Sequence, residues 1–160
     1  MGAIIMPSTS LIAKLRRDYP QFTFKNAHVA HWSPLDRTVY IRPLRTLDDH
    51  ITCLHELGHA IRGHKTYHQD IELLRCEREA WETARNVAPR YDIAIPDEMI
   101  AAALDTYRTW LHRRSRCPQC GHAAPQTREL TYQCLLCDTS WTANDARQCG
   151  LKRYTKPSII

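Results

Sequence analysis

The sequence has no long hydrophobic run, since none of its apolar stretches approaches the roughly 18 residues that a helix needs to cross a bilayer. The first ten residues include a short apolar patch, but they have neither the positive n-region nor the hydrophobic core of a signal peptide. There is also no internal repeat and no low-complexity segment. These absences argue against a membrane protein or a repeat array, and we expect a cytoplasmic protein with no membrane partner.

The composition is that of an ordinary globular protein, with 43% hydrophobic and 24% charged residues in 160. That length allows one compact core, or a small domain joined to a metal-stabilised module. Because disulfides are rare in the cytoplasm, we expect the seven cysteines to be thiols or metal ligands.

The charge is unevenly distributed along the chain. Residues 1–110 carry 14 basic and 14 acidic side chains, whereas residues 111–160 carry 8 and 3. The net charge of +5 therefore lies entirely in the C-terminal part. We predict two modules, a neutral body over residues 1–112 and a basic module over residues 113–160.

The body is predicted to have an α+β fold that contains a helix, a β-hairpin or small sheet, and three further helices. Polar residues before Leu11, and Pro20 behind it, delimit the first helix. Period-two alternation predicts strands at 22–24, 28–32 and 38–41, the last two joined by a turn. Caps and apolar periodicity predict the other helices at about 46–63, at 71–88 and from 96 onward.

The second predicted helix contains the sequence His-Glu-Leu-Gly-His at positions 55–59. Residues four apart lie on the same face of a helix, so His55 and His59 can direct two imidazole nitrogens to one point. Glu56 lies next to them and can take a proton from water held there. This arrangement is typical of zinc hydrolases, with Glu56 as the general base.

A zinc peptidase needs a third protein ligand. In the extended three-histidine motif the third His stands six residues after the second, which is position 65. This chain has Lys65 there and His64 one residue earlier, so the pattern fails by one residue. His68 is better explained as a solvated loop residue. The remaining candidates are carboxylates of the third predicted helix: Glu77, Glu79 and Glu82.

The helical wheel separates these three carboxylates. Glu77 falls in the middle of the apolar face that includes Leu73, Ala80 and Trp81, whereas Glu79 and Glu82 fall on the arginine-rich face. A carboxylate within an apolar stripe needs a partner, because its burial unpaired is costly. A zinc ion is one such partner and a buried salt bridge is the other; we favour zinc bound by His55, His59 and Glu77.

On these residues the chain resembles the ImmA/IrrE-type metallopeptidases, small gluzincins of bacteria, phages and mobile elements. The resemblance covers residues 8–110 and depends on His55-Glu56-Leu57-Gly58-His59-Ala60 and on Glu77-Arg78-Glu79-Ala80. It implies zinc ligation by His55, His59 and Glu77, with Glu56 as the general base. Such proteins usually have Asn or Asp four residues after the third ligand, where this chain has Trp81, whereas Glu82 is followed four residues later by Asn86.

The basic module contains a second metal motif, two Cys-x-x-Cys knuckles with thirteen residues between them. Four thiolates at this spacing close a tetrahedral structural zinc site, and segments this short rarely fold without one. We predict a zinc ribbon with Tyr132 and Trp141 in its core, and with these ligands: Cys117, Cys120, Cys134 and Cys137. His122 is a less economical substitute.

The positive charge of this module suits a nucleic-acid backbone, and equally a protein dock or a stabilising cap. The candidate nucleic-acid contacts are Arg113, Arg114, Arg116, Lys152 and Arg153.

Three function classes follow. The first is a zinc metalloendopeptidase with one catalytic and one structural Zn²⁺, acting on a specific protein such as a DNA-bound regulator. The second is a SprT-like protease of DNA–protein crosslinks, a family that also joins a His-Glu-x-x-His helix to a zinc ribbon but takes its third ligand from a His-Gly motif. The third is a non-catalytic, zinc-stabilised module that binds protein or nucleic acid.

Overall fold

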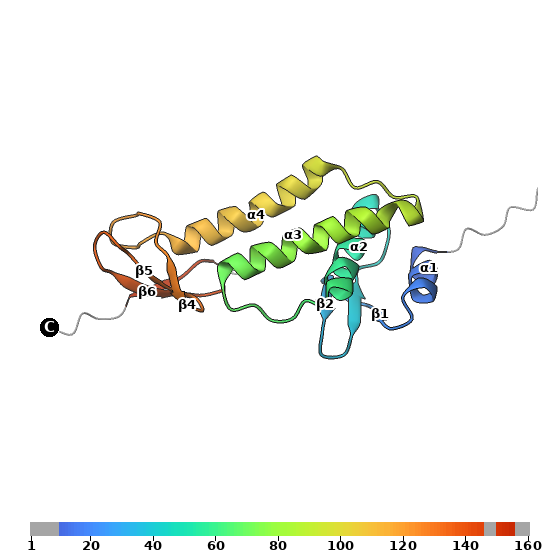
Figure 1. Cartoon of the computed structure of the whole chain (residues 1–160), viewed down its shortest axis with the longest axis horizontal. Coiled ribbons are helices and arrows are strands. Elements are labelled where there is room, and N and C mark those ends of the chain that lie inside the picture. The colour runs from blue at the N-terminus through green and yellow to red at the C-terminus, as the bar shows by residue number, and fades with distance from the viewer. Residues whose placement is uncertain (1–9, 146–149, 156–160) are drawn as a thin grey trace, which may run out of the picture. The chain divides into compact units, whose positions relative to one another are not determined.

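The computed structural model describes residues 10–145 and 150–155, which form a mixed α+β fold with four α-helices and two small sheets (Figure 1). The chain divides into two compact units: residues 1–65 with 79–96, and residues 66–78 with 97–160. Helix α3 (Asp70–Val87) runs without interruption through both. A compact unit need not be an independently folding domain, so the predicted boundary at residue 112 stays a prediction.

The first unit begins with helix α1 (Leu11–Asp18), whose N-terminus is capped by Ser10 and which buries Leu11 and Leu15. A three-stranded sheet follows, with strands β1 (Thr23–Asn26), β2 (His31–Ser33) and β3 (Thr38–Ile41). The sheet order is β1-β3-β2, in which β2 and β3 form the predicted antiparallel hairpin and β1 pairs with β3 in parallel. The parallel pair was not predicted, and β2 begins at His31 instead of at His28.

Helix α2 (Leu47–Arg62) packs against β3 and β2 (Figure 1). Its N-terminus is a capping box, since the Thr46 hydroxyl accepts from the Asp49 N–H while the Asp49 carboxylate accepts from the Thr46 N–H. Its C-terminus is Gly63 in the left-handed conformation, at φ 67°. The predicted limits at Thr46 and Gly63 are therefore the observed ones.

Helix α3 ends at Val87, one residue before its predicted end, and is followed by the 3₁₀ turn η1 (Ala88–Tyr91). The face that the wheel identified is the buried one, with these residues less than 9% exposed: Leu73, Glu77, Ala80, Trp81, Ala84 and Ala88. Glu82, on the opposite face, is exposed. The apolar periodicity of this helix therefore predicted its orientation.

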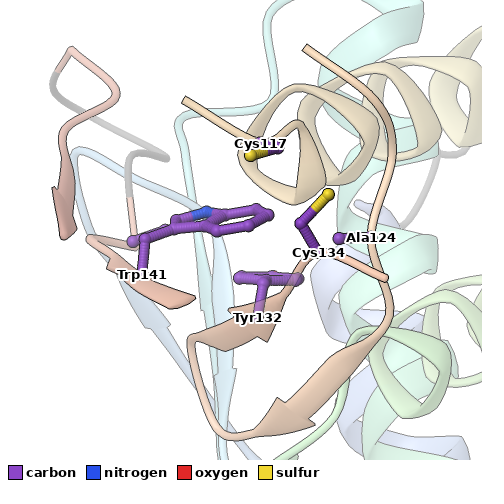
Figure 2. Packing of buried hydrophobic residues seen from close by; sticks show 6 residues of the cluster. Cys117, Ala124, Tyr132, Cys134 and Trp141 are labelled. Carbon is purple, nitrogen blue, oxygen red and sulfur yellow. The ribbon is translucent and has the colours of Figure 1, made fainter. Parts of the chain in front are cut away.

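The second unit contains the first part of α3, helix α4 (Asp97–Ser115) and a four-stranded antiparallel sheet. Its strands, in the sheet order β4-β5-β6-β7, are β4 (Gln126–Arg128), β5 (Thr131–Gln133), β6 (Ser140–Ala143) and β7 (Arg153–Thr155). The core of this sheet is small and includes Tyr132 and Trp141, whose rings stack 5.6 Å apart (Figure 2). Both aromatic residues are the ones predicted for this core.

None of the helices within residues 10–145 and 150–155 has the length and apolar character needed to cross a membrane.

Candidate metal centres

Helix α2 places His55 and His59 one turn apart, and their Nε2 atoms lie 3.2 Å from each other. Two imidazole nitrogens bound to one tetrahedral zinc at its usual bond length would be about 3.3 Å apart. The ring of His55 is stacked on the indole of Trp81, with centroids 4.2 Å apart and an interplanar angle of 27°. The two histidines therefore have the spacing of zinc ligands, and one of them is supported from α3.

The approach of α3 to α2 depends on Gly58, which lies between the two histidines. A Cβ at this position would overlap the carbonyl oxygen of Ala80 and lie 3.0 Å from its carbonyl carbon. Only glycine permits this approach, because any side chain would displace the backbone of α3. Gly58, which has no ligand role, thus determines how close the two helices can come.

Glu77 lies one turn before Trp81 on α3, and the continuous helix fixes its position relative to Ala80 and Trp81. One ligand atom from each of His55, His59 and Glu77 lies within 4.8 Å of the others. Glu77 is only 4% exposed. The structure thus brings together the three residues that the sequence predicted as ligands of a catalytic metal.

The other candidate ligands lie elsewhere. The Glu79 carboxylate accepts from His64 and pairs with Arg62, at 3.1 and 3.6 Å. Glu82 is exposed. His68 is exposed, and its Nδ1 is 3.2 Å from the Glu129 carboxylate. None of these is in the group that could hold the metal.

Glu56 is held by strand β2, because its Oε2 accepts a hydrogen bond from the Trp32 backbone N–H at 2.9 Å. Trp32 also donates its indole N–H to the His64 carbonyl oxygen, at 2.9 Å. Sequence reasoning missed Trp32 as a site residue, since it lies 24 positions from Glu56 and its contact with Glu56 uses the main chain. The carboxylate next to the two histidines is therefore oriented by the neighbouring edge of the sheet.

A chain of polar contacts extends from His59 away from the group of ligands. His59 Nδ1 lies 2.9 Å from His64 Nδ1, and His64 Nε2 lies 3.1 Å from Glu79 Oε2. Burial of the imidazole lowers the pKa of His64, although the hydrogen bond to Glu79 opposes this effect. In the sequence His64 was considered only as a third ligand, and no pattern indicated this contact.

Two imidazoles and a buried carboxylate are a donor set that zinc prefers. The spacing of the two Nε2 atoms and the 4.8 Å limit of the group both fit one ion. His55, His59 and Glu77 could therefore hold zinc.

The second candidate metal centre is in the C-terminal sheet region, where the sulfur atoms of Cys117, Cys120, Cys134 and Cys137 converge within 4.8 Å. Three Sγ–Sγ distances are 3.5 Å, for the pairs Cys117–Cys137, Cys120–Cys134 and Cys120–Cys137. A disulfide requires about 2.05 Å, whereas sulfurs around one tetrahedral zinc are about 3.8 Å apart. The four cysteines therefore have the geometry of a zinc site and not of disulfides.

Hydrogen-bond donors in the knuckles favour thiolates. The backbone N–H groups of Cys137 and Leu136 lower the pKa of Cys134, and the Thr139 hydroxyl and N–H lower that of Cys137. At Cys120 the His122 N–H acts in the same direction, but desolvation and the neighbouring sulfurs raise the pKa to about 12. Thiolates as close as these sulfurs repel one another, so a bound cation would stabilise the cluster.

The structure corrects one predicted nucleic-acid contact. Arg114 is 1% exposed and its guanidinium contacts Asp70, the Tyr132 hydroxyl and the face of Trp110. A buried, paired guanidinium is not accessible to a phosphate, so Arg114 is no longer a candidate nucleic-acid contact. The other four are exposed: Arg113, Arg116, Lys152 and Arg153.

Three cysteines and Tyr91 lie outside both groups of candidate ligands. Cys53 is buried and Cys76 is half-buried, while Cys149 lies outside the described residues. The Tyr91 hydroxyl donates to the Asp18 carboxylate at 3.0 Å, and burial raises the pKa of Tyr91. This tyrosine therefore stabilises the contact between η1 and α1.

A scan of protein-family models found no match to the chain, and searches of curated proteins and of solved structures also found none. Functional inference therefore depends on the geometry of the two candidate metal centres.

Proposed function

We propose that the chain is a zinc-dependent metalloendopeptidase that hydrolyses peptide bonds in a specific protein, such as a DNA-bound regulator. Its body would be a small gluzincin of the ImmA/IrrE type, and its ribbon a docking or DNA-binding module. The observation that carries the proposal is the convergence of His55, His59 and Glu77 beside Glu56.

The catalytic roles follow from the positions of the side chains. Zinc bound by His55, His59 and Glu77 would supply a Lewis acid and lower the pKa of a bound water. Glu56 would take a proton from that water at its carboxylate and later deliver it to the leaving amine. The Trp32 N–H holds Oε2 of Glu56, so the carboxylate is oriented before substrate arrives.

The position of β2 at one end of its sheet supports a peptide as the substrate. Strand β2 is at one end of the sheet order β1-β3-β2, and Trp32 directs its N–H to Glu56 instead of to β3. An extended peptide that pairs with this edge would pass its backbone beside the Glu56 carboxylate. This arrangement favours proteolysis over hydrolysis of a small molecule.

The decisive experiment compares Glu56→Gln with the wild type in two measurements. Zinc content should be two ions per chain in both proteins, because Glu56 is not a ligand. New N-termini in a protein mixture, identified by terminal labelling and mass spectrometry, should be produced by the wild type and not by Glu56→Gln. Glu82→Gln, an exposed carboxylate of α3, is the matched control and should cleave normally.

Equal cleavage by Glu56→Gln would refute the proposed role. Two bound zinc ions without any Glu56-dependent cleavage would instead favour the non-catalytic binding module.

The SprT-like alternative differs in its third ligand. Glu77→Gln should reduce zinc content to one ion per chain if Glu77 is the ligand, and should leave two if a histidine is. The SprT-like hypothesis would be favoured if cleavage required DNA-crosslinked protein and Glu77→Gln kept a zinc content of two ions per chain.

A further inference from the structure

The contact chain His59–His64–Glu79 has only one arrangement of protons that leaves His59 able to bind a metal. A neutral imidazole carries one N–H, so one ring nitrogen donates and the other accepts. His59 and His64 face each other through their Nδ1 atoms at 2.9 Å, so one of the two must be the donor. The choice at this contact determines the protonation of both outer nitrogens.

In the first arrangement His59 carries its proton on Nδ1 and donates it to His64. His64 then has its proton on Nε2, where it donates to the Glu79 carboxylate 3.1 Å away. The Nε2 of His59 keeps its lone pair, and this atom is the one that lies 3.2 Å from Nε2 of His55. The contacts His59–His64 and His64–Glu79 are then both hydrogen bonds with one donor and one acceptor.

In the reverse arrangement His64 donates from Nδ1 and His59 carries its proton on Nε2. The His64 Nε2 lone pair would then face the Glu79 carboxylate at 3.1 Å, and two acceptors at this distance repel. His59 Nε2 would also be a donor and could not ligate a metal. Of the two neutral arrangements, the charge of Glu79 therefore favours the first, which is also the only one that leaves His59 able to bind a metal through Nε2.

We propose that His64 and Glu79 are positioning residues for the metal. Together they hold His59 as the Nδ1–H tautomer, with its Nε2 lone pair directed at the group formed with His55 and Glu77. A metal-binding histidine usually donates its other N–H directly to a carboxylate, a carbonyl or water. Here the His64 imidazole lies between His59 and the Glu79 carboxylate. The inference rests on the zinc site of the proposed function but does not require hydrolysis.

The contact of Glu79 with Arg62 does not account for this arrangement. The Arg62 side chain is 47% exposed and 3.6 Å from Glu79, whereas the His64 side chain is 10% exposed and 3.1 Å away. Exposed ion pairs contribute little to stability, and a half-buried charge-assisted hydrogen bond is stronger. The His64 contact is therefore the shorter and more buried of these two, and Arg62 provides a matched control.

The test uses the full chain and measures, by competition with a chelator, the affinity for zinc at the site of His55, His59 and Glu77. His64→Ala and Glu79→Ala should each weaken that affinity by about 10- to 100-fold, the usual effect of removing an outer-shell partner. His64→Gln should recover part of the loss, because its amide oxygen can accept from His59 Nδ1–H. Arg62→Ala should bind zinc as the wild type does.

A second readout would not respond to a purely structural role. Two-bond imidazole ¹H–¹⁵N spectra of the zinc-loaded chain should show His59 protonated at Nδ1, with this proton exchanging faster in His64→Ala. Unchanged zinc affinity in both His64→Ala and Glu79→Ala, or ligation of His59 through Nδ1, would overturn the inference. If His64→Ala does not fold, Glu79→Ala decides.

The two proposals fail in different ways. A wild-type chain that takes up only one zinc ion would sink the proposed function together with this inference. Two zinc ions in the wild type, with unchanged affinity in the variants, would sink the inference alone.

Discussion

The indole of Trp81 stacks on the imidazole of His55, with the ring centroids 4.2 Å apart. Trp81 stands four residues after Glu77, one turn further along α3. The stacking therefore restrains the plane of His55 from the helix that also carries Glu77. On the other histidine, His59, the contact comes from His64.

The stacking predicts different effects for two replacements of Trp81. Trp81→Ala should cost about 3–5 kcal/mol of unfolding free energy, because Trp81 is only 8% exposed. It should also weaken zinc binding by His55, His59 and Glu77, because His55 loses the ring on which it stacks. Trp81→Phe should cost much less, because a phenyl ring can still stack and the indole N–H has no hydrogen-bond partner among the described residues. Denaturant unfolding and zinc competition measure both effects; an equal loss in the two variants would contradict the stacking role.

Gly58→Ala should destabilise the protein, against the usual trend. Within a helix this change normally stabilises by about 0.5–1 kcal/mol. Here the added methyl would overlap the Ala80 carbonyl, and overpacking of this kind costs about 1–3 kcal/mol. Because the clash also separates α2 from α3, the variant should lose zinc affinity at the site of His55, His59 and Glu77.

Gly63→Ala is the control for this prediction. It should lower stability through its left-handed backbone, and it should keep the α2–α3 contact, since a Cβ there meets no atom within 4 Å. A more stable Gly58→Ala protein with full zinc content would refute the close approach of the helices.

Breaking the buried pair of Arg114 and Asp70 should destabilise the second unit. Arg114→Met leaves Asp70 beside the Tyr132 hydroxyl without its cation, and removal of one partner of a buried pair costs about 3–5 kcal/mol. The double variant Arg114→Met/Asp70→Asn should recover much of this loss, because no uncompensated charge remains. Additive losses in a double-mutant cycle of unfolding free energies would show that the two residues do not interact.

If the ribbon binds nucleic acid, its affinity should fall steeply as salt rises, because phosphate contacts release counterions. Replacing the exposed Arg113 and Arg116 by Ser should reduce the slope of log affinity against log salt by about 2. Fluorescence anisotropy with a labelled duplex, at several salt concentrations, measures this slope. A flat salt dependence in the wild type would favour a protein dock.

The sequence by itself determined the local features of this protein. The cap at Thr46 and the stop at Gly63 depend on neighbouring residues, and both limits of α2 were predicted. The apolar periodicity of α3 placed Glu77 on its buried face for the same reason, since a helical face depends on spacing alone. The spacing of the cysteines predicted the ribbon cluster, because each knuckle is a local turn.

Only the tertiary structure decided the contacts between distant positions. Trp32 meets Glu56 through a backbone N–H, and His64 meets Glu79 across 15 residues, neither of which leaves a pattern in the sequence. Arg114 looked like one more basic residue until its partner 44 positions away showed that it is buried. Spacing fixes which side chains share a face of one helix, whereas packing between elements fixes what each face meets.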